Sequence, residues 1–264
     1  MVTSLIRGVA RRLRMAVRVV LGRTYYTYID EPPMKGAYPS YDAAMSSQPP
    51  RQMVGYDHDE IVPDKVETMS SVLPWDYPIL FWLQRILPNV DRMIDAGGHV
   101  GAKYRAFQTL MPLPSSFDWI VLDLPATVAE GRRLAAAEGL QNLRFETDPE
   151  KLPPAKVLLA SGLLQYYPHS LSTLLRQLKE MPEHLLVNKV ALRDGPAFFT
   201  MQQVGPSRVP YQVRNRDVFL RDVAALGYEI VDRWDIPGLY HTIATHPELG
   251  QSESYGFYFR RGAK

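Results

Sequence analysis

From residue 74 onward, short apolar runs alternate with segments whose apolar residues recur every three or four positions. Such runs predict buried strands, and the three-to-four spacing predicts amphipathic helices. The expected strands are 90–95, 119–123, 143–146, 157–161 and 184–188. The expected helices are 77–87 (with Asp76 as its N-cap), 101–110, 127–138 and 171–179. Because strands and helices alternate, we expect a parallel sheet covered by helices on both faces.

The last third of the chain departs from this alternation. A helix through 226 is expected, with Asn215 as its N-cap and Gly227 after its end. Strands 228–234 and 255–260 then follow one another without a helix between them, so they are expected to pair antiparallel. The pattern predicts a three-layer α/β/α domain over 74–264, its sheet mostly parallel with one antiparallel C-terminal strand.

The first 73 residues lack the alternation. Residues 5–23 carry six arginines among apolar residues, and no acid occurs before Asp30. We expect a basic amphipathic helix over 1–23, suited to an anionic membrane surface, and an irregular arm over 24–73. Alternatively, the helix packs its apolar residues on its own domain and keeps the arginine heads solvated. Arginines interrupt every apolar stretch here, so neither a cleaved signal peptide nor a membrane span is expected.

Composition narrows the function classes. The hydrophobic share of 46% is typical of a globular protein, and a net charge of only +2 indicates no nucleic-acid partner. The absence of cysteine excludes disulfides, a thiolate nucleophile and cysteine-ligated zinc. A cytoplasmic location, peripheral on the inner face of the membrane through residues 5–23, is compatible with these features. The acidic run 56–60 could hold a metal, but neighbouring side chains point different ways, so none is expected.

The turn 95–101 joins the first strand of the alternating region to its helix. Ligands of open α/β sheets bind beyond the carboxyl ends of the strands. Gly97, Gly98 and Gly101 allow tight backbone geometry and the close approach of a ligand. The following helix N-terminus offers unpaired N–H groups. Sharp turns without any ligand need the same glycines, so the turn alone leaves both interpretations open.

Two acidic residues at strand ends favour S-adenosyl-L-methionine over a dinucleotide as the cofactor. Asp95 ends the first strand, where its carboxylate would repel the phosphates of a dinucleotide such as NAD. S-adenosyl-L-methionine has no phosphate and carries a positive ammonium and sulfonium, which suit an acid. Asp123 ends the second strand and is placed to accept hydrogen bonds from two ribose hydroxyls, although a solvated or capping acid is the alternative. Together the two acids predict an S-adenosyl-L-methionine site.

At these motifs the chain resembles S-adenosylmethionine-dependent methyltransferases of bacterial surface-polysaccharide gene clusters, over roughly 36–260. The resemblance is carried by Gly55-Tyr56-Asp57, Asp95-Ala96-Gly97-Gly98 with Gly101 and Tyr104, Asp123-Leu124-Pro125, Ser161-Gly162-Leu163-Leu164-Gln165-Tyr166, Asn188-Lys189-Val190, Gly227-Tyr228-Glu229 and Gly256-Phe257-Tyr258. It implies a Rossmann-like class I methyltransferase fold and an enzyme of the methyl-transferring class. The implied cofactor contacts are Asp95, Gly97, Gly98, Gly101, Asp123, Leu124, Ser161 and Tyr166.

The chemistry at the acceptor side is less specified by the sequence. The ring face of Tyr166 could lie near the sulfonium, or Tyr166 could serve only as an aromatic lid. A hydroxyl acceptor would benefit from a base near neutral pH, for which histidine is suited. His241 and His169 are the catalytic candidates, ahead of His58, although each could equally be a packing or surface residue.

Two long loops, 191–214 and 235–254, are expected to frame the acceptor pocket. The acceptor is expected to be a small molecule or glycan, such as a sugar or glycolipid precursor, methylated on a hydroxyl or amine. His99 stands where the broader pattern often has glycine. This favours an alternative interpretation, a non-catalytic binding or scaffold protein of the same fold at a membrane surface.

Overall fold

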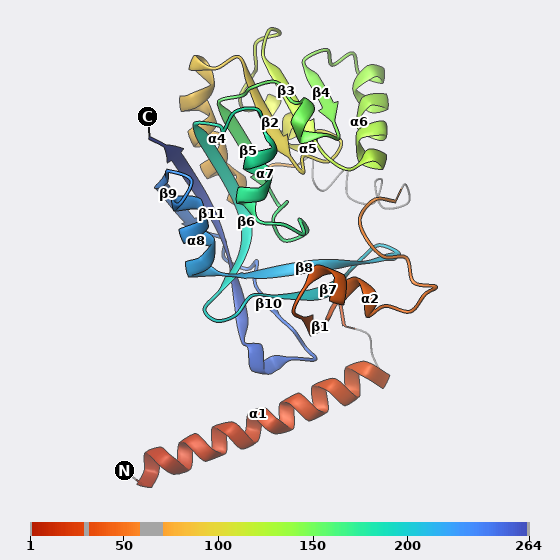
Figure 1. Cartoon of the computed structure of the whole chain (residues 1–264), viewed down its shortest axis with the longest axis vertical. Helices are drawn as coiled ribbons and strands as arrows, with labels where there is room; N and C mark the ends of the chain where they lie inside the picture. Colours follow the sequence, from red (N-terminus) through yellow and green to blue (C-terminus); the bar gives the residue numbers. More distant parts are fainter. Residues whose placement is uncertain (1, 29–31, 59–70, 263–264) are drawn as a thin grey trace.

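The computed structural model describes residues 2–28, 32–58 and 71–262, and its centre is a mostly parallel sheet (Figure 1). The parallel strands are β2 (Arg92–Ala96), β3 (Asp118–Leu122), β4 (Leu143–Glu146), β5 (Val157–Ser161) and β6 (His184–Arg193). They lie in the order β4-β3-β2-β5-β6. Strand β11 (Gln251–Arg261) lies antiparallel between β6 and β9 (Tyr228–Asp235). The predicted fold class is therefore confirmed, including the antiparallel C-terminal strand.

Helices cover both faces of this sheet, because alternate residues of each strand point to opposite sides. On β3, Trp119 and Val121 enter one apolar cluster, whereas Ile120 and Leu122 enter the other. The first cluster receives residues from α4 (Tyr77–Ile86), α5 (Ala102–Gln108) and α6 (Pro125–Ala137). The second receives residues from α7 (Leu171–Gln177) and α8 (Arg216–Ala224). The three layers follow from this division.

Two predicted helix caps have different outcomes. Asn215 caps α8, its side-chain oxygen accepting the Val218 N–H at 2.8 Å, as expected. Asp76 occupies the N-cap position of α4, as predicted, but its side chain makes no capping hydrogen bond to that helix. Its carboxylate instead accepts the Leu73 N–H at 3.0 Å and pairs with Lys103, because α4 packs beside α5.

The prediction of a long loop over 191–214 is wrong. Strand β6 continues to Arg193, and β7 (Phe198–Val204) and β8 (Ser207–Asn215) form an antiparallel hairpin. Strand β8 joins the main sheet by pairing parallel with the end of β6. The polar residues and Pro210 in this stretch hide its strand character, since the partner that covers β7 comes from the N-terminal arm.

The arm expected to be irregular contains β1 (Met34–Tyr38), which pairs antiparallel with β7, and α2 (Tyr41–Ser46). The second expected loop, 235–254, is mostly irregular. It holds the two-residue strand β10 (His241–Thr242) and the short 3-10 helix η5 (Pro247–Leu249) before β11 begins. The site region is thus bordered by a small β layer, β1-β7-β8, in place of the first expected loop, and by the mostly irregular second segment.

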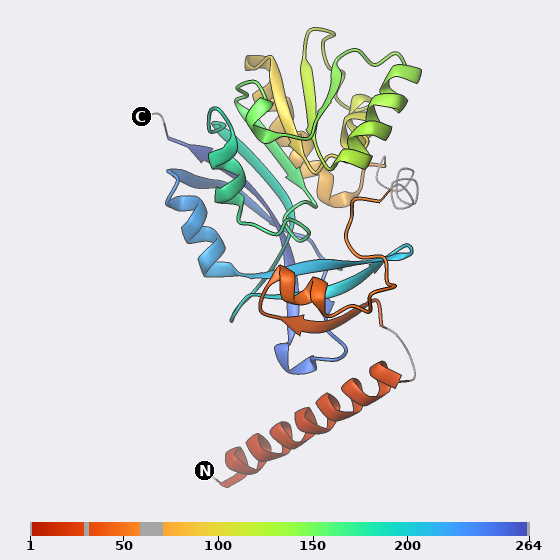
Figure 2. The same ribbon diagram turned by 45° about the vertical axis from the view of Figure 1, so that its right-hand side comes forward.

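Helix α1 (Val2–Tyr28) extends away from the body, and both views show it beside the β1-β7-β8 side (Figures 1 and 2). Its last turns contact the segment around η5. Arg23 donates from Nε to the Thr245 carbonyl at 3.3 Å and pairs with Glu248 at 2.8 Å. Within the described ranges, no helix is both long and apolar enough to cross a membrane.

Candidate active site

The turn after β2 is built on backbone hydrogen bonds that close it tightly. The Gly97 N–H donates to the Leu122 carbonyl at 2.8 Å, and the Gly101 N–H donates to the Gly98 carbonyl at 3.1 Å. Gly97 and Gly101 have φ of 71° and 83°, the left-handed region that favours glycine. A Cβ at Gly98 would lie 2.5 Å from Asp95 Oδ2. The turn therefore wraps closely over the Asp95 carboxyl group.

Asp95 is 1% exposed at the end of β2 and receives a hydrogen bond from Trp119 Nε1 at 3.0 Å. Burial raises the pKa of this carboxyl to about 7, while the Trp119 hydrogen bond opposes the rise. The nearby charge of Asp123 raises the pKa further, and that of Lys103 lowers it. Asp95 therefore changes charge near neutral pH, and a neighbouring cation would favour its ionised form.

Asp123 directly follows β3 and holds the turn through its side chain. Its Oδ2 accepts the His99 N–H at 2.8 Å, and its Oδ1 accepts the Leu124 N–H at 2.8 Å. Burial raises the pKa of Asp123, and these two backbone hydrogen bonds oppose the rise. Each carboxylate oxygen can accept a further hydrogen bond, so a pair of adjacent ligand hydroxyls fits this group. Leu124 beside it is 40% exposed.

A cavity of about 150 Å³ lies where the turn meets α5, the carboxyl end of β5 and the middle of β6. It is lined by Leu73, Asp95, Gly97, Gly98, Ala102, Lys103, Ser161 and Lys189. The structure thus brings four predicted cofactor residues together, Asp95, Gly97, Gly98 and Ser161. It adds Lys103, which sequence reasoning did not single out, and Lys189, which the sequence indicated only through a resemblance motif.

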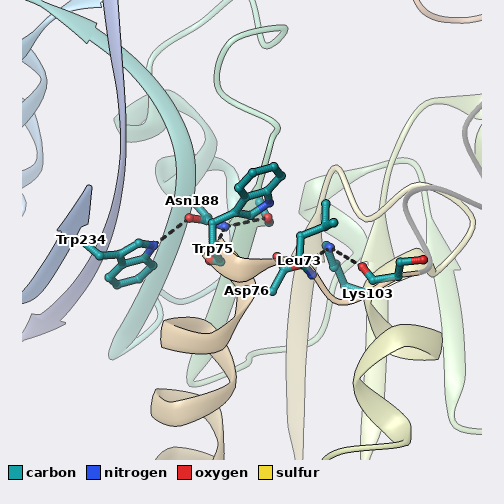
Figure 3. Close-up of polar contacts among 8 residues, drawn as sticks. Leu73, Trp75, Asp76, Lys103, Asn188 and Trp234 are labelled. Atoms are coloured by element: carbon teal, nitrogen blue, oxygen red, sulfur yellow. Dashed lines mark hydrogen bonds and ion pairs between the residues drawn. The ribbon is translucent and has the colours of Figure 1, made fainter. Parts of the chain in front are cut away.

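Lys103 is buried, and its Nζ lies 2.6 Å from Asp76 Oδ2 and 3.5 Å from the Ser71 carbonyl (Figure 3). Asp76 is 0% exposed. A lysine in the first turn of a helix is ordinarily solvated, and its acidic partner stands 27 positions earlier in the chain. No local pattern could have identified this buried pair.

Asn188, on β6, connects the cavity wall to the far edge of the sheet (Figure 3). Its Nδ2 donates to the Trp75 carbonyl at 3.2 Å and to Ser161 Oγ at 3.4 Å, and its Oδ1 accepts the Trp234 Nε1–H at 3.0 Å. The amide therefore fixes the end of β5 against the segment before α4. Asn188 and Lys189 belong to one of the resemblance motifs, which was the only sequence signal for them.

Four aromatic side chains form a continuous series on the other side of the site, here termed the ring chain. Tyr56 contacts Tyr166 with ring centroids 5.0 Å apart, Tyr166 contacts Tyr211 at 5.5 Å, and Tyr211 contacts His241 at 5.0 Å. The Tyr166 hydroxyl donates to Gln202 Oε1 at 2.8 Å. Burial lowers the pKa of His241, so its imidazole is mostly neutral at pH 7.

The ring chain begins beside the acids. Burial raises the pKa of Tyr56 to about 12, and the charge of Asp123 contributes to the rise. Asp57 Oδ1 accepts the Ala126 N–H at 3.1 Å, which attaches the arm to the start of α6. Tyr166, predicted as a cofactor contact, therefore stands between the acids and His241.

The other two histidines lie elsewhere. His169 is exposed, its ring contacts Tyr167 at 5.5 Å, and its carbonyl accepts a hydrogen bond from Arg214 at 3.0 Å. His58 Nε2 lies 2.9 Å from the Val54 carbonyl. Of the two catalytic candidates, the structure brings only His241 into the ring chain, and neither His241 nor His169 is among the cavity-lining residues. Asp59 and Glu60, from the acidic run 56–60 that was considered as a metal site, lie outside the described residues.

Comparisons with known proteins give structural likeness only. No protein-family model and no curated protein sequence matches the chain. An O-methyltransferase family protein from Burkholderia thailandensis is 12% identical, with a TM-score of 0.51, over 78% of this chain and 59% of that one.

Two further solved structures have lower TM-scores. The 1,6-didemethyltoxoflavin-N1-methyltransferase of Burkholderia thailandensis, solved with its substrate and S-adenosylhomocysteine, is 17% identical with a TM-score of 0.48, over 72% of this chain and 79% of that one. The N-terminal domain of EvdMO1 with bound S-adenosylhomocysteine is 12% identical with a TM-score of 0.47, over 72% and 83%. At such identities likeness concerns the fold alone. The strand order and the match to the O-methyltransferase family protein, with its TM-score of 0.51, show that the chain has the Rossmann-like class I methyltransferase fold.

Proposed function

We propose that this chain binds S-adenosyl-L-methionine and transfers its methyl group to a hydroxyl or amine of a small-molecule or glycan acceptor. The acceptor class that we propose is a sugar or glycolipid precursor of surface polysaccharide, although the sequence resemblance itself supplies no acceptor. One observation carries the proposal. Two partly or fully buried carboxyl groups, Asp95 and Asp123, stand at the carboxyl ends of neighbouring strands around one glycine-rich turn.

The two acids suit the two polar ends of this cofactor. Asp123 has one backbone N–H on each oxygen and can accept both ribose hydroxyls. The cavity presents the Asp95 carboxyl together with Lys103 and Lys189, so it offers both signs of charge. A zwitterionic amino-acid end, with ammonium toward Asp95 and carboxylate toward a lysine, fits that set. A dinucleotide pyrophosphate would instead face two acids.

The chain's own residues would act mainly by positioning. The cofactor supplies an activated methyl group on its sulfonium, and in-line alignment with the acceptor supplies much of the acceleration. The ring chain forms an apolar wall beside the acids and excludes water there. For a hydroxyl acceptor, the neutral His241 imidazole would take the hydroxyl proton as the oxygen accepts the methyl group.

Calorimetric titration of the full chain with S-adenosyl-L-methionine tests binding. We expect saturable binding, and Asp123→Ala should weaken it by about 10- to 100-fold because two charge-assisted hydrogen bonds are lost. Asp194→Ala, an exposed acid that pairs with Arg216, is the matched control and should bind normally. An absence of binding at millimolar cofactor, or tight binding of NAD instead, would refute the proposal.

A scan of sugar and glycolipid hydroxyls and amines for S-adenosylhomocysteine formation then tests transfer. Binding without turnover across all acceptors would favour the non-catalytic alternative.

A further inference from the structure

Helix α1 has two chemically opposite faces. Residues three or four positions apart share a side of a helix. One side carries apolar residues, namely Ile6, Val9, Leu13, Val17 and Val20. The opposite side carries arginines, namely Arg7, Arg11, Arg14 and Arg18. The helix therefore has an apolar stripe along its length, which we call the α1 apolar stripe, and a basic stripe behind it.

The α1 apolar stripe faces solvent in the part of the chain that the structure describes. Its side chains are exposed by 51% at Val17 to 67% at Leu13. In the part of the chain that the structure describes, α1 meets the body at its last turns. Gly22 lies against the Ala244 carbonyl, and Arg23 bonds to Thr245 and Glu248. A contiguous exposed apolar surface of this kind marks an interaction site.

The charge of α1 distinguishes between occupants of this stripe. The helix holds six arginines and no acid. A second copy of α1 would bring the same positive charges together, with no glutamate or aspartate at the flanks to pair with them. An anionic bilayer supplies both missing partners, acyl chains for the stripe and phosphates for the arginines. Long arginine side chains can reach the phosphates while their stems remain on the apolar surface.

The dimensions agree with a planar partner. A straight helix of 27 residues is about 40 Å long, since each residue adds about 1.5 Å. Both views show it projecting clear of the sheets, on the side of the β1-β7-β8 layer (Figures 1 and 2). A flat surface can therefore meet the whole stripe without meeting the body first.

We propose that α1 lies in the interfacial layer of an anionic bilayer, with the α1 apolar stripe among the acyl chains and its arginines at the lipid phosphates. Helix α1 joins the body through Arg23, which bonds to Thr245 and Glu248. Both partners lie in the irregular segment that follows His241. Thr245 Oγ1 also accepts the Gly36 N–H of β1 at 2.9 Å. The bilayer would therefore face the β1-β7-β8 side of the molecule. This proposal does not depend on methyl transfer.

Vesicle flotation of the full chain tests the proposal. The chain should float with vesicles of phosphatidylcholine containing phosphatidylglycerol, and at least about tenfold less with phosphatidylcholine alone. Leu13→Asp, which places a charge in the stripe, should reduce flotation by about tenfold or more. The double variant Arg11→Glu and Arg18→Glu should also reduce flotation by about tenfold or more, because it reverses the charge at two positions of the basic stripe.

Two control substitutions make the same chemical changes elsewhere. Val218→Asp alters an apolar side chain that is 45% exposed on α8, and Arg176→Glu alters an exposed arginine on α7. Both should float like the unaltered chain. Because α1 lies outside the core, all variants should keep the same thermal unfolding midpoint and the same affinity for S-adenosyl-L-methionine. The affinity measurement separates failure of this proposal from failure of the proposed function.

Three results would overturn the proposal. They are an absence of flotation with anionic vesicles, equal flotation with neutral vesicles, and flotation unaffected by Leu13→Asp. Light scattering without lipid gives an independent check. If the chain self-associates and Leu13→Asp makes it monomeric, a second copy covers the stripe instead.

Discussion

The two sides of the proposed site are built in opposite ways. The acid side, Asp95 and Asp123 with their turn, comes from two successive strand–turn units in one stretch of chain. The ring chain takes its members from the arm, the turn after β5, β8 and β10. The first side is local in sequence, and the second is assembled across most of the chain. The proposed cofactor contacts therefore lie largely in one compact motif, whereas the proposed acceptor side depends on the tertiary structure.

The two sides also differ in electrostatics. The acid side keeps ionisable groups in a buried setting, where Asp95 has a pKa of about 7. On the ring chain, burial raises the pKa of Tyr211 and Tyr166 and lowers that of His241, so all three are mostly neutral at pH 7. The acid side is thus suited to recognising charge, and the ring chain to shape and water exclusion. The following variants test that division, from the largest expected effect to the smallest.

His241→Gln should lower kcat by about 100- to 10,000-fold for a hydroxyl acceptor, because the base that takes the proton is removed. The affinity for S-adenosyl-L-methionine should not change, since His241 belongs to the ring chain. His169→Gln is the matched control and should keep kcat, because His169 is exposed. Steady-state kinetics with an identified acceptor would measure both. If His169→Gln caused the loss instead, the ring chain would not contain the base.

Lys103→Met should lower the free energy of unfolding by about 3–5 kcal/mol, because the buried Asp76 carboxylate loses its cation. Adding Asp76→Asn should restore part of the stability. Urea unfolding measures the effect, and Lys151→Met, which removes an exposed pair with Asp148, should change it little. A loss in Lys103→Met no larger than in this control would show that the buried pair does not stabilise the acid side.

Asp95→Asn should stabilise the cofactor-free chain at neutral and alkaline pH. The pKa of Asp95 is raised from 3.8 to about 7 by folding, so the folded state binds this proton more tightly and stability is lost as pH rises through that interval. The gain in the variant should therefore grow between about pH 4 and pH 7 and reach at most about 4 kcal/mol.

The measurement is the thermal unfolding midpoint of both proteins across that pH range. S-adenosyl-L-methionine should bind the unaltered chain more tightly as Asp95 ionises, whereas its affinity for the variant should vary little over the same range. A stability difference independent of pH would contradict the titration of Asp95.

Tyr166→Phe should cost only about 1–2 kcal/mol of stability, because it removes the hydrogen bonds of the hydroxyl to Gln202 and Tyr56 but keeps the ring contacts. Cofactor affinity should stay the same, since the ring face is retained. Differential scanning fluorimetry and calorimetry measure the two quantities. A large loss of cofactor affinity would show that the Tyr166 hydroxyl contributes to cofactor binding, and it would contradict the division between the acid side and the ring chain.

Much of the α/β core could be predicted because its signals are short-range. Strands β4 and β5 have the expected bounds, and Asn215 caps α8 as expected. The β7-β8 hairpin was predicted as a loop, because its strand character depends on the pairing of β7 with β1, more than 150 residues away. A single-sequence pattern has no access to such a partner.

By itself, the sequence determined the order of strands and helices in the α/β core, the glycine-rich turn with Asp95 and Asp123, and the apolar and basic character of α1. Periodicity and turn stereochemistry act within a few residues, so they can be recognised locally. Only the tertiary structure decided that Lys103 is buried against Asp76, that His241 rather than His169 joins the ring chain, and that the α1 apolar stripe faces solvent. Burial and pairing depend on segments that are distant in sequence, and the fold alone places them side by side.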